Sequence, residues 1–141
     1  MPSEPPQRIE EDALGSITIT GPTHRGAHLH GINTTRAVDN FALGSSTLGD
    51  HADYLDALFE VKLAACRANV DIGALNADVG AAIEAACLQR LDRSLGGEPV
   101  SGSHFPVDML EGSGGTSTNM NVNEVIANLS LLHMGLSLIH I

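Results

Sequence analysis

The sequence predicts a mostly α-helical domain with a small extended or hairpin segment near residues 9–33 and three main helices. Two stretches, 55–70 and 79–91, repeat apolar residues at steps of three and four, the spacing of one buried helix face. The 141-residue chain is 43% hydrophobic but only 3% aromatic and has no Trp. Its core must therefore come from small aliphatic side chains, which let helices pack closely.

The N-terminal part predicts short extended elements before the first helices. Residues 1–8, rich in Pro and polar side chains, predict a mobile arm. The run Ile-Thr-Ile-Thr at 17–20, broken by Gly-Pro at 21–22, predicts a hairpin or an extended entry segment. Residues 34–41 predict one or two helical turns, and residues 42–50 predict a Gly/Ser-rich loop.

Two main helices follow, separated by a break at residues 71–76 that contains Gly73. The first is expected to bury Leu55, Leu58, Phe59, Leu63, Cys66 and Val70. The second is expected to bury Val79, Ala82, Ile83, Ala86, Cys87 and Leu91. It should end near Ser94, because the Gly-Gly-Glu-Pro run at 96–99 cannot continue a helix.

A third main helix is expected after a long loop at residues 95–120, which contains six glycines. Asn121 and Glu124 have the spacing of a capping box, so the helix should begin near Asn121. Its predicted apolar face consists of Val122, Val125, Ile126, Leu129 and Leu132.

The charge of the chain excludes one class of function. The formal net charge is −10, whereas a nucleic-acid-binding protein needs a basic surface to displace counterions. A small anionic substrate is not excluded, because a local site can be positive on an acidic protein. Cys66 and Cys87 lie inside apolar helical patterns and are read as buried free thiols. With no apolar signal-peptide region and no membrane-spanning stretch, the expected location is the cytoplasm.

The loop that leads into the third helix, residues 112–124, carries the candidate chemistry. Glycines let a backbone approach a ligand closely or adopt positive φ. The hydroxyls of Thr116, Ser117 and Thr118 are neutral donors, and N–H groups at a helix start add partial positive charge. These groups suit a carboxylate or phosphate. The same residue types also form ordinary turns that cap a helix, and no Gly-Lys-Ser/Thr follows, so the loop is not a P-loop.

Three ordered segments resemble the aspartase/fumarase superfamily. Residues 105–128 resemble its first signature region, and the Gly-Thr-Ser-Thr-Asn-Met-Asn at 115–121 is closer to aspartases than to the usual Gly-Thr-Gln-Ser-Asn-Met-Asn of class II fumarases. Residues 8–15 (Arg-Ile-Glu-Glu-Asp-Ala-Leu-Gly) resemble the opening of aspartases, and residues 31–41 resemble the family's Gly-Ile-His-Thr-Leu-Arg-Ala-x-Glu-Asn-Phe. The resemblance covers nearly all of residues 8–135.

The chain departs from the family at several positions. Asn33 replaces the usual His, Thr35 the usual Leu and Glu111 the usual Gln. His28 and His30 stand where aspartases tend to have aromatic residues. These departures bear on the substrate more than on the fold.

The resemblance implies an N-terminal fragment of a lyase that reversibly eliminates ammonia from L-aspartate to give fumarate. Negative charge grows on the substrate carboxylate as a proton leaves, and fixed donors must stabilise it. By resemblance Thr116 contacts the substrate, Gly114 and Gly115 shape the approach, and Ser117 and Asn119 hold the loop and the helix start. The family's catalytic base is a Ser on a downstream Gly-Ser loop, so no catalytic residue is expected here and the chain alone should be inactive. The resemblance implies no cofactor, no catalytic metal and a homotetramer for the full-length enzyme.

Other polar residues were weighed as sites. His24, His28 and His30 have a spacing that could bind a metal, but no Cys or carboxylate motif accompanies them, and scattered surface imidazoles are the favoured interpretation. Arg36 could bind a carboxylate or tie down neighbouring backbone. His104, beside the motif, is expected to be solvated.

The domain organisation and two alternatives complete the prediction. By the resemblance, residues 9–135 are expected to form an incomplete fumarate lyase N-terminal domain. Residues 136–141 resemble the translation of a transposon end used in sequencing libraries and are expected to be a non-native tail. The alternatives are a class II fumarase, which hydrates fumarate to malate, and a non-catalytic helical interaction module that docks on a longer lyase. The isolated chain is expected to be marginally stable.

Overall fold

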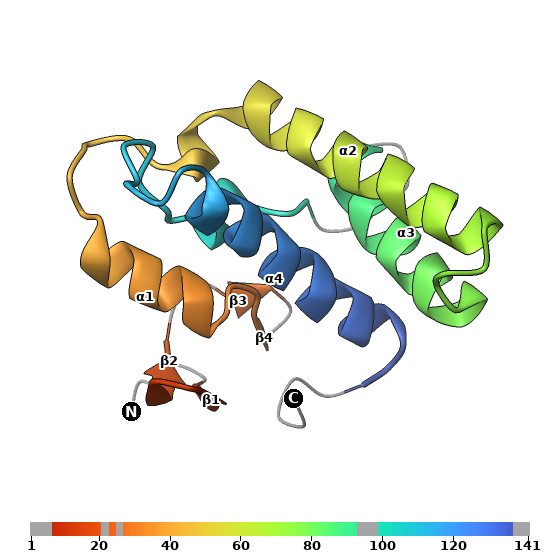
Figure 1. Ribbon diagram of the computed structural model, residues 1–141, viewed down its shortest axis with the longest axis horizontal. Coiled ribbons are helices and arrows are strands. Elements are labelled where there is room, and N and C mark those ends of the chain that lie inside the picture. The colour runs from red at the N-terminus through yellow and green to blue at the C-terminus, as the bar shows by residue number, and fades with distance from the viewer. Residues whose placement is uncertain (1–6, 21–22, 25–26, 93–98, 137–141) are drawn as a thin grey trace.

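The computed structural model describes residues 7–20, 23–24, 27–92 and 99–136. Their order is β1 (Arg8–Asp12), β2 (Gly15–Ile19), β3 (Thr23–His24), β4 (Ala27–His28), α1 (Ile32–Asn40), the 3-10 turn η1 (Leu48–Asp50), α2 (Ala52–Asp71), α3 (Ala77–Leu91), the 3-10 turn η3 (Gly102–His104) and α4 (Thr116–His133). In Figure 1, α4 crosses the middle of the molecule, α2 and α3 lie to one side of it, and α1 with the hairpin lies to the other. The predicted mostly α architecture is confirmed.

The extended N-terminal segment forms two small antiparallel hairpins. In the first, Arg8 pairs with Ile19 and Asp12 with Gly15, which adopts φ 109° after the two-residue turn. Arg8, which the sequence placed in the mobile arm, instead begins β1 and is buried. Its guanidinium donates to the carbonyl of His30 at 2.9 Å and to Glu10 at 2.7 Å, so it joins the hairpin to the segment before α1.

Helix α1 is anchored to both the hairpin and α4. Arg36 donates to the two carboxylate oxygens of Asp12 at 2.8 and 2.7 Å and to the carbonyl of Gly15 at 3.0 Å. The Asp12 carboxylate, in turn, raises the pKa of the Arg36 guanidinium through this bidentate pairing. Of the two roles weighed for Arg36, the structure therefore shows the one that ties neighbouring elements together.

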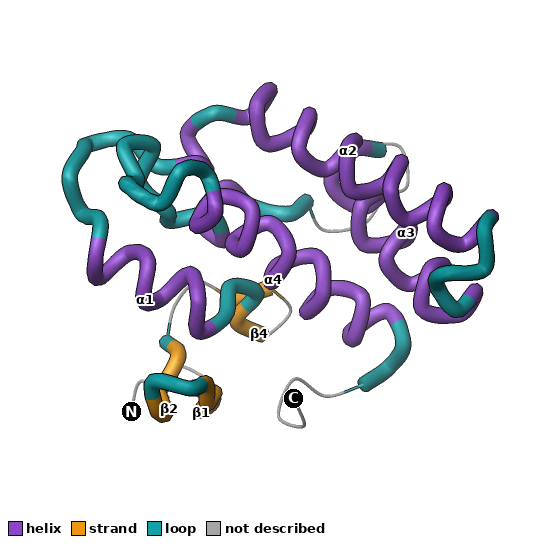
Figure 2. The backbone as a smooth tube through the Cα atoms, in the orientation of Figure 1, coloured by secondary structure: helices purple, strands orange, loops and turns teal. Residues whose placement is uncertain are grey.

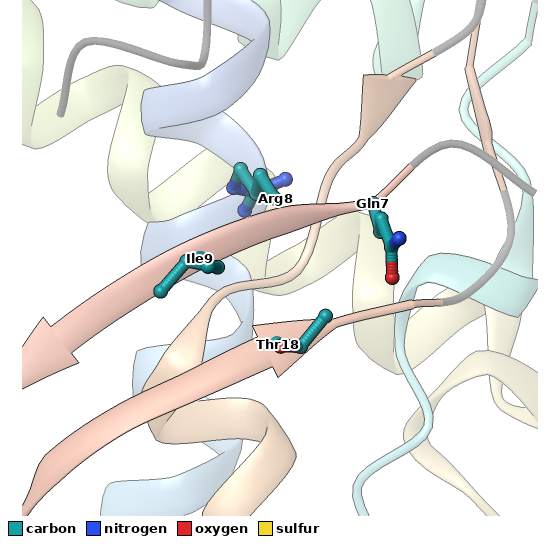
Figure 3. Close-up of a pocket in the computed structure, with 4 residues that line it drawn as sticks. All are labelled: Gln7, Arg8, Ile9 and Thr18. Carbon is teal, nitrogen blue, oxygen red and sulfur yellow. The ribbon is translucent and has the colours of Figure 1, made fainter.

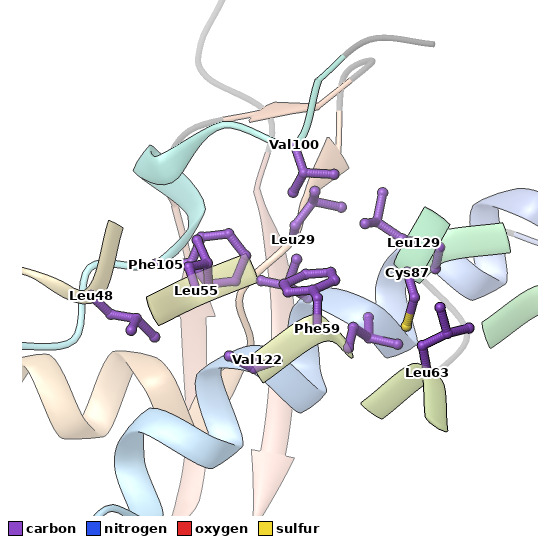
Figure 4. Close-up of a cluster of buried hydrophobic side chains, with 13 residues drawn as sticks. Leu29, Leu48, Leu55, Phe59, Leu63, Cys87, Val100, Phe105, Val122 and Leu129 are labelled. Carbon is purple, nitrogen blue, oxygen red and sulfur yellow. The ribbon is translucent and has the colours of Figure 1, made fainter. Parts of the chain in front are cut away.

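The core lies where α2, α3 and α4 meet (Figure 4). Leu55, Phe59, Leu63 and Cys66 of α2 are buried, as predicted, while Leu58 and Val70 of the same predicted face are half-buried. The rings of Phe59 and Phe105 meet edge to face, with centroids 5.9 Å apart, which joins α2 to the segment that precedes the candidate loop.

The second predicted face is largely confirmed in α3. Ala82, Ala86 and Cys87 are buried, and Ile83 and Leu91 are half-buried. Val79 is 38% exposed, which the predicted pattern did not anticipate. The neighbouring Gly80 is the position of this turn that packs against α2, where an added Cβ would lie 2.3 Å from a methyl carbon of Val70. Helix α3 ends at Leu91, and the predicted end near Ser94 falls outside the described residues.

The predicted start of the third main helix is wrong by five residues, because α4 begins at Thr116 and not at Asn121. Asn121 is fully buried within the helix and donates to the carbonyl of His104 at 3.0 Å. Glu124 does not reach back to form a capping box; its carboxylate accepts hydrogen bonds from the start of α1. Local preference of Ser, Thr and Asn for caps was overridden by tertiary contacts.

Within the described ranges, no helix combines the length and the apolar character needed to cross a lipid bilayer.

Candidate substrate-binding loop

Backbone hydrogen bonds between residues 48–49 and residues 105–107 hold the chain just before the candidate loop. The N–H groups of Leu48 and Gly49 donate to the carbonyls of Val107 and Phe105 at 2.8 and 3.0 Å. The backbones approach so closely that a Cβ on Gly49 would lie 2.0 Å from the carbonyl oxygen of Gly102. Figure 2 shows the loops on either side of these contacts gathered at the end of the molecule where α4 begins.

Asp108 locks the same junction through its side chain. Its carboxylate accepts the N–H groups of Leu110 at 2.8 Å and Leu43 at 3.0 Å, together with that of Gly44. Hydrogen bonding from the Leu110 N–H, and then from those of Gly44 and Leu43, lowers the pKa of the Asp108 carboxyl. An ionised carboxylate thus fixes the direction in which the chain leaves Asp108 toward the glycine-rich turn.

Two successive glycines make the turn into α4. Gly114 and Gly115 have φ values of 68° and 91°, in the left-handed region that side chains with a Cβ rarely adopt. A Cβ built on either would meet no heavy atom within 4 Å, so the space beside both is open. Gly115 is the N-cap of α4 and Thr116 its first residue, and Thr116 is exposed. The three residues predicted to bind substrate therefore lie together at an accessible helix start.

Glu111 lies under this turn and binds several of its donors. Its carboxylate accepts the Ser113 N–H at 3.0 Å, the Ser113 hydroxyl, and the Thr118 hydroxyl at 3.4 Å. Burial raises the pKa of the Glu111 carboxyl, but hydrogen bonds from Ser113, Ser117 and Gly115 outweigh it and leave the pKa lowered. The departure from the family's Gln thus introduces a negative charge at the N-terminal end of α4.

The backbone N–H groups of Ser117 and Asn119, the two residues expected to hold the loop and the helix start, both have acceptors. The Ser117 N–H donates to the hydroxyl of Ser113 at 2.8 Å, and the Asn119 N–H donates to the carbonyl of Gly115 at 3.0 Å. Both contacts satisfy donors of the first turn of α4.

Lys62 lies beside the candidate loop and was not among the site residues predicted from the sequence. Its ammonium lies 2.5 Å from Oδ1 of Asn119, one turn into α4 from Thr116. A signal was available, because Lys62 stands beside Leu63 and four residues after Leu58, at the edge of the apolar face of α2. A lysine at the edge of a buried face can extend its ammonium toward a neighbouring element.

Among the described residues, no group of three or more side chains that could ligate a metal occurs. His24 and His28 fall in β3 and β4, whose side chains lie outside the described part of the chain, and His30 is buried. The expectation that His104 is solvated is wrong, since it is 1% exposed. Its carbonyl accepts a hydrogen bond from the side-chain amide of Asn121.

A surface hollow elsewhere, about 480 Å³ in volume, is lined by Gln7, Arg8, Ile9 and Thr18 (Figure 3). It lies on the first hairpin and shares no residue with the glycine-rich loop. The guanidinium of Arg8, which lines this hollow, donates to Glu10 and to the carbonyl of His30.

Comparison with known proteins agrees with this arrangement. The chain is 44% identical over 128 residues to an aspartate ammonia-lyase of Pseudomonas aeruginosa. The aligned region covers 91% of this chain and 25% of that enzyme. The chain is also 38% identical over 128 residues to a class II fumarate hydratase of the same organism, again covering 91% of this chain and 25% of that enzyme. No protein-family model matches the chain.

Solved structures agree as well. A fumarate lyase:delta crystallin of Brucella melitensis superposes with a TM-score of 0.79 and 40% identity over 92% of this chain and 28% of that one. The chain thus spans about a quarter of the length of the relatives it matches. From the hairpin to α4, this chain matches an N-terminal fragment of proteins of the aspartase/fumarase family.

Proposed function

We propose that this chain is the N-terminal part of an aspartate ammonia-lyase, which reversibly eliminates ammonia from L-aspartate to give fumarate. The observation that carries the proposal is the Gly114-Gly115-Thr116 turn. It presents an exposed threonine hydroxyl at a helix start within a segment that matches aspartate ammonia-lyases. The full-length enzyme would be a cytoplasmic homotetramer without a cofactor.

In this proposal Thr116 binds the substrate carboxylate on which negative charge develops. Its hydroxyl and the N–H groups of the first turn of α4 are fixed before substrate arrives, because the turn is held by Glu111, Ser113 and Asp108. Donors that are already oriented stabilise a developing charge without further reorganisation. Gly114 and Gly115 leave open space beside this hydroxyl, through which a substrate can approach.

The chemistry also needs a base to remove a proton and an acid to assist the departure of ammonia. None of the residues of this loop is assigned either role. We therefore expect the 141-residue chain by itself to lack lyase activity, and the test needs the remainder of a lyase.

The test is a chimera in which this chain replaces the aligned 128-residue segment of the Pseudomonas aeruginosa enzyme. The chimera is expected to convert L-aspartate to fumarate. In it Thr116→Val should lower kcat/KM by about 100- to 1,000-fold, because one donor to the developing charge is lost. Thr116→Ser keeps a hydroxyl and should retain most activity. Thr18→Val, on the exposed strand β2, is the control.

A class II fumarase is the second candidate, favoured by the 38% identity to a fumarate hydratase. The same chimera, supplied with fumarate and either ammonia or water alone, separates the two reactions by its product, aspartate or malate. A folded chimera without either activity would contradict both enzyme proposals and favour a non-catalytic interaction module.

A further inference from the structure

The N-terminal end of α4 already holds an anion that belongs to the chain. Glu111 accepts hydrogen bonds from Ser113 and Thr118. Burial raises the pKa of its carboxyl, but hydrogen bonds from Ser113, Ser117 and Gly115 leave it lowered. They hold the Glu111 carboxylate at the start of α4, where a bound carboxylate would otherwise be the group that meets the partial positive charge of the helix end. The open side of the turn thus retains the Thr116 hydroxyl but has lost much of the positive character of the helix end.

The charges nearby do not restore that positive character fully. A helix N-terminus carries the equivalent of roughly half a positive charge, and one ionised carboxylate exceeds it. Asp108, at the beginning of the same loop, adds a second carboxylate with a lowered pKa. The ammonium of Lys62 contributes one positive charge, held against Oδ1 of Asn119.

We propose that Glu111 is a specificity-determining residue of the Thr116 site: its carboxylate disfavours a dicarboxylate without a cationic group relative to the matching amino acid. The inference rests on the proposed function, because it assumes that the ligand carboxylate binds at Thr116. A substrate ammonium is attracted to the field of Glu111, whereas a second carboxylate is repelled by it. The residue does not touch the ligand, since its oxygens are taken up by the turn.

The test uses the 141-residue chain, labelled for NMR, and two ligands that differ by an ammonium group, succinate and L-aspartate. Kd values are measured from the amide shifts of Thr116 and Asn119 at constant ionic strength. The wild-type chain is expected to bind L-aspartate more tightly than succinate. Glu111→Gln keeps a hydrogen-bond acceptor and removes the charge, so the ratio of the succinate Kd to the L-aspartate Kd should fall about two- to fivefold.

Two further variants separate charge from shape. Glu111→Asp keeps the charge and should leave the ratio close to that of the wild type. Glu60→Gln removes an equal charge from an exposed position on α2 and should have no effect. A ratio that is unchanged or higher in Glu111→Gln, or that falls equally in Glu111→Asp, would overturn the inference.

A second readout is independent of substrate. Relaxation enhancement of the Thr116 amide by a cationic and an anionic nitroxide of equal size reports the local potential. The ratio of cationic to anionic enhancement should fall in Glu111→Gln and stay constant in Glu60→Gln. Loop amides that respond to neither ligand in the wild type would count against the proposed function. The nitroxide ratio would then decide the role of Glu111, and an unchanged ratio would overturn it.

Discussion

The carboxylate of Glu124, in the third turn of α4, lies 2.6 Å from the hydroxyl oxygen of Thr34 near the start of α1. The same carboxylate accepts the N–H groups of Gly31, Asn33 and Thr34 at 2.8, 2.8 and 3.1 Å. No side chain of the N-cap residue of α1 accepts a hydrogen bond from the helix start. The carboxylate of Glu124, 90 positions after Thr34, accepts these hydrogen bonds instead. A negative charge at that end also interacts favourably with the helix dipole. This contact fixes α1 on the helix that carries the candidate site.

We expect Glu124→Ala to lower the free energy of unfolding by about 2 kcal/mol, because hydrogen bonds to a charged group are lost and several N–H groups lose their acceptor. Urea denaturation followed by circular dichroism measures the change. Glu60→Ala, on the exposed face of α2, should change stability by less than about 0.5 kcal/mol. Equal effects of the two substitutions would show that the Glu124 contact does not stabilise the fold.

Gly115 is expected to tolerate Asn better than Val. At φ 91° a β-branched residue is strained, and Gly115→Val should destabilise the chain by about 1–2 kcal/mol. Asn enters the left-handed region more readily, so Gly115→Asn should cost less. Thermal unfolding of both variants gives the comparison. If Val is accepted as well as Asn, the positive φ is not needed to start α4.

The lowered pKa of Asp108 predicts acid sensitivity with a definite sign. Because the folded-state pKa lies below the unfolded value of about 3.9, the stabilisation is complete above that value and is lost as pH falls through the folded pKa. Urea midpoints measured at falling pH should therefore decline, and Asp108→Asn should flatten the decline while lowering stability at neutral pH. Asp71→Asn, at the exposed end of α2, is the control. An unaltered slope in Asp108→Asn would contradict the assignment.

Both thiols are expected to be unreactive in the folded chain. Burial raises the pKa of Cys87 to about 12, and burial also raises the pKa of Cys66. Since the thiolate is the reacting form, alkylation near pH 8 should be slow in buffer and rapid for both thiols in urea. Mass spectrometry of the alkylated chain, with Cys66→Ser and Cys87→Ser for assignment, gives the rates. Fast native labelling of Cys87 would place it outside the α2–α3–α4 core.

Periodic elements were predictable from local sequence because their signal does not depend on distant residues. The spacing of Leu55, Phe59 and Leu63 is enough to define a buried helix face, and α2 buries it. Gly73 likewise marked the end of α2 without reference to the rest of the chain. The β-branched run at 17–20 correctly indicated the extended strand β2, but the hairpin turns at residues 13–14, and the predicted break at 21–22 lies outside the described residues.

The candidate site was predictable only in part. The amino-acid sequence of the loop pointed to Gly114, Gly115 and Thr116 through its resemblance to the family. The structure groups these residues at an open turn. Their role in substrate binding stays a prediction that the chimera tests. Lys62 and Glu111 did not enter the predicted site, because each reaches it from another position in the fold: one from the face of α2, the other from beneath the turn.

By itself the sequence determined the buried faces of α2 and α3, the break between them at Gly73, and the resemblance to the aspartase/fumarase superfamily. Tertiary structure alone decided where α4 begins and what Asn121 and Glu124 do. Considered locally, Ser, Thr and Asn favour a cap over a helix interior, so the local signal placed the start of the helix too late. Burial of Asn121 against η3 and capture of Glu124 by α1 select the helix, because a buried polar group or an uncapped helix end without such partners is costly.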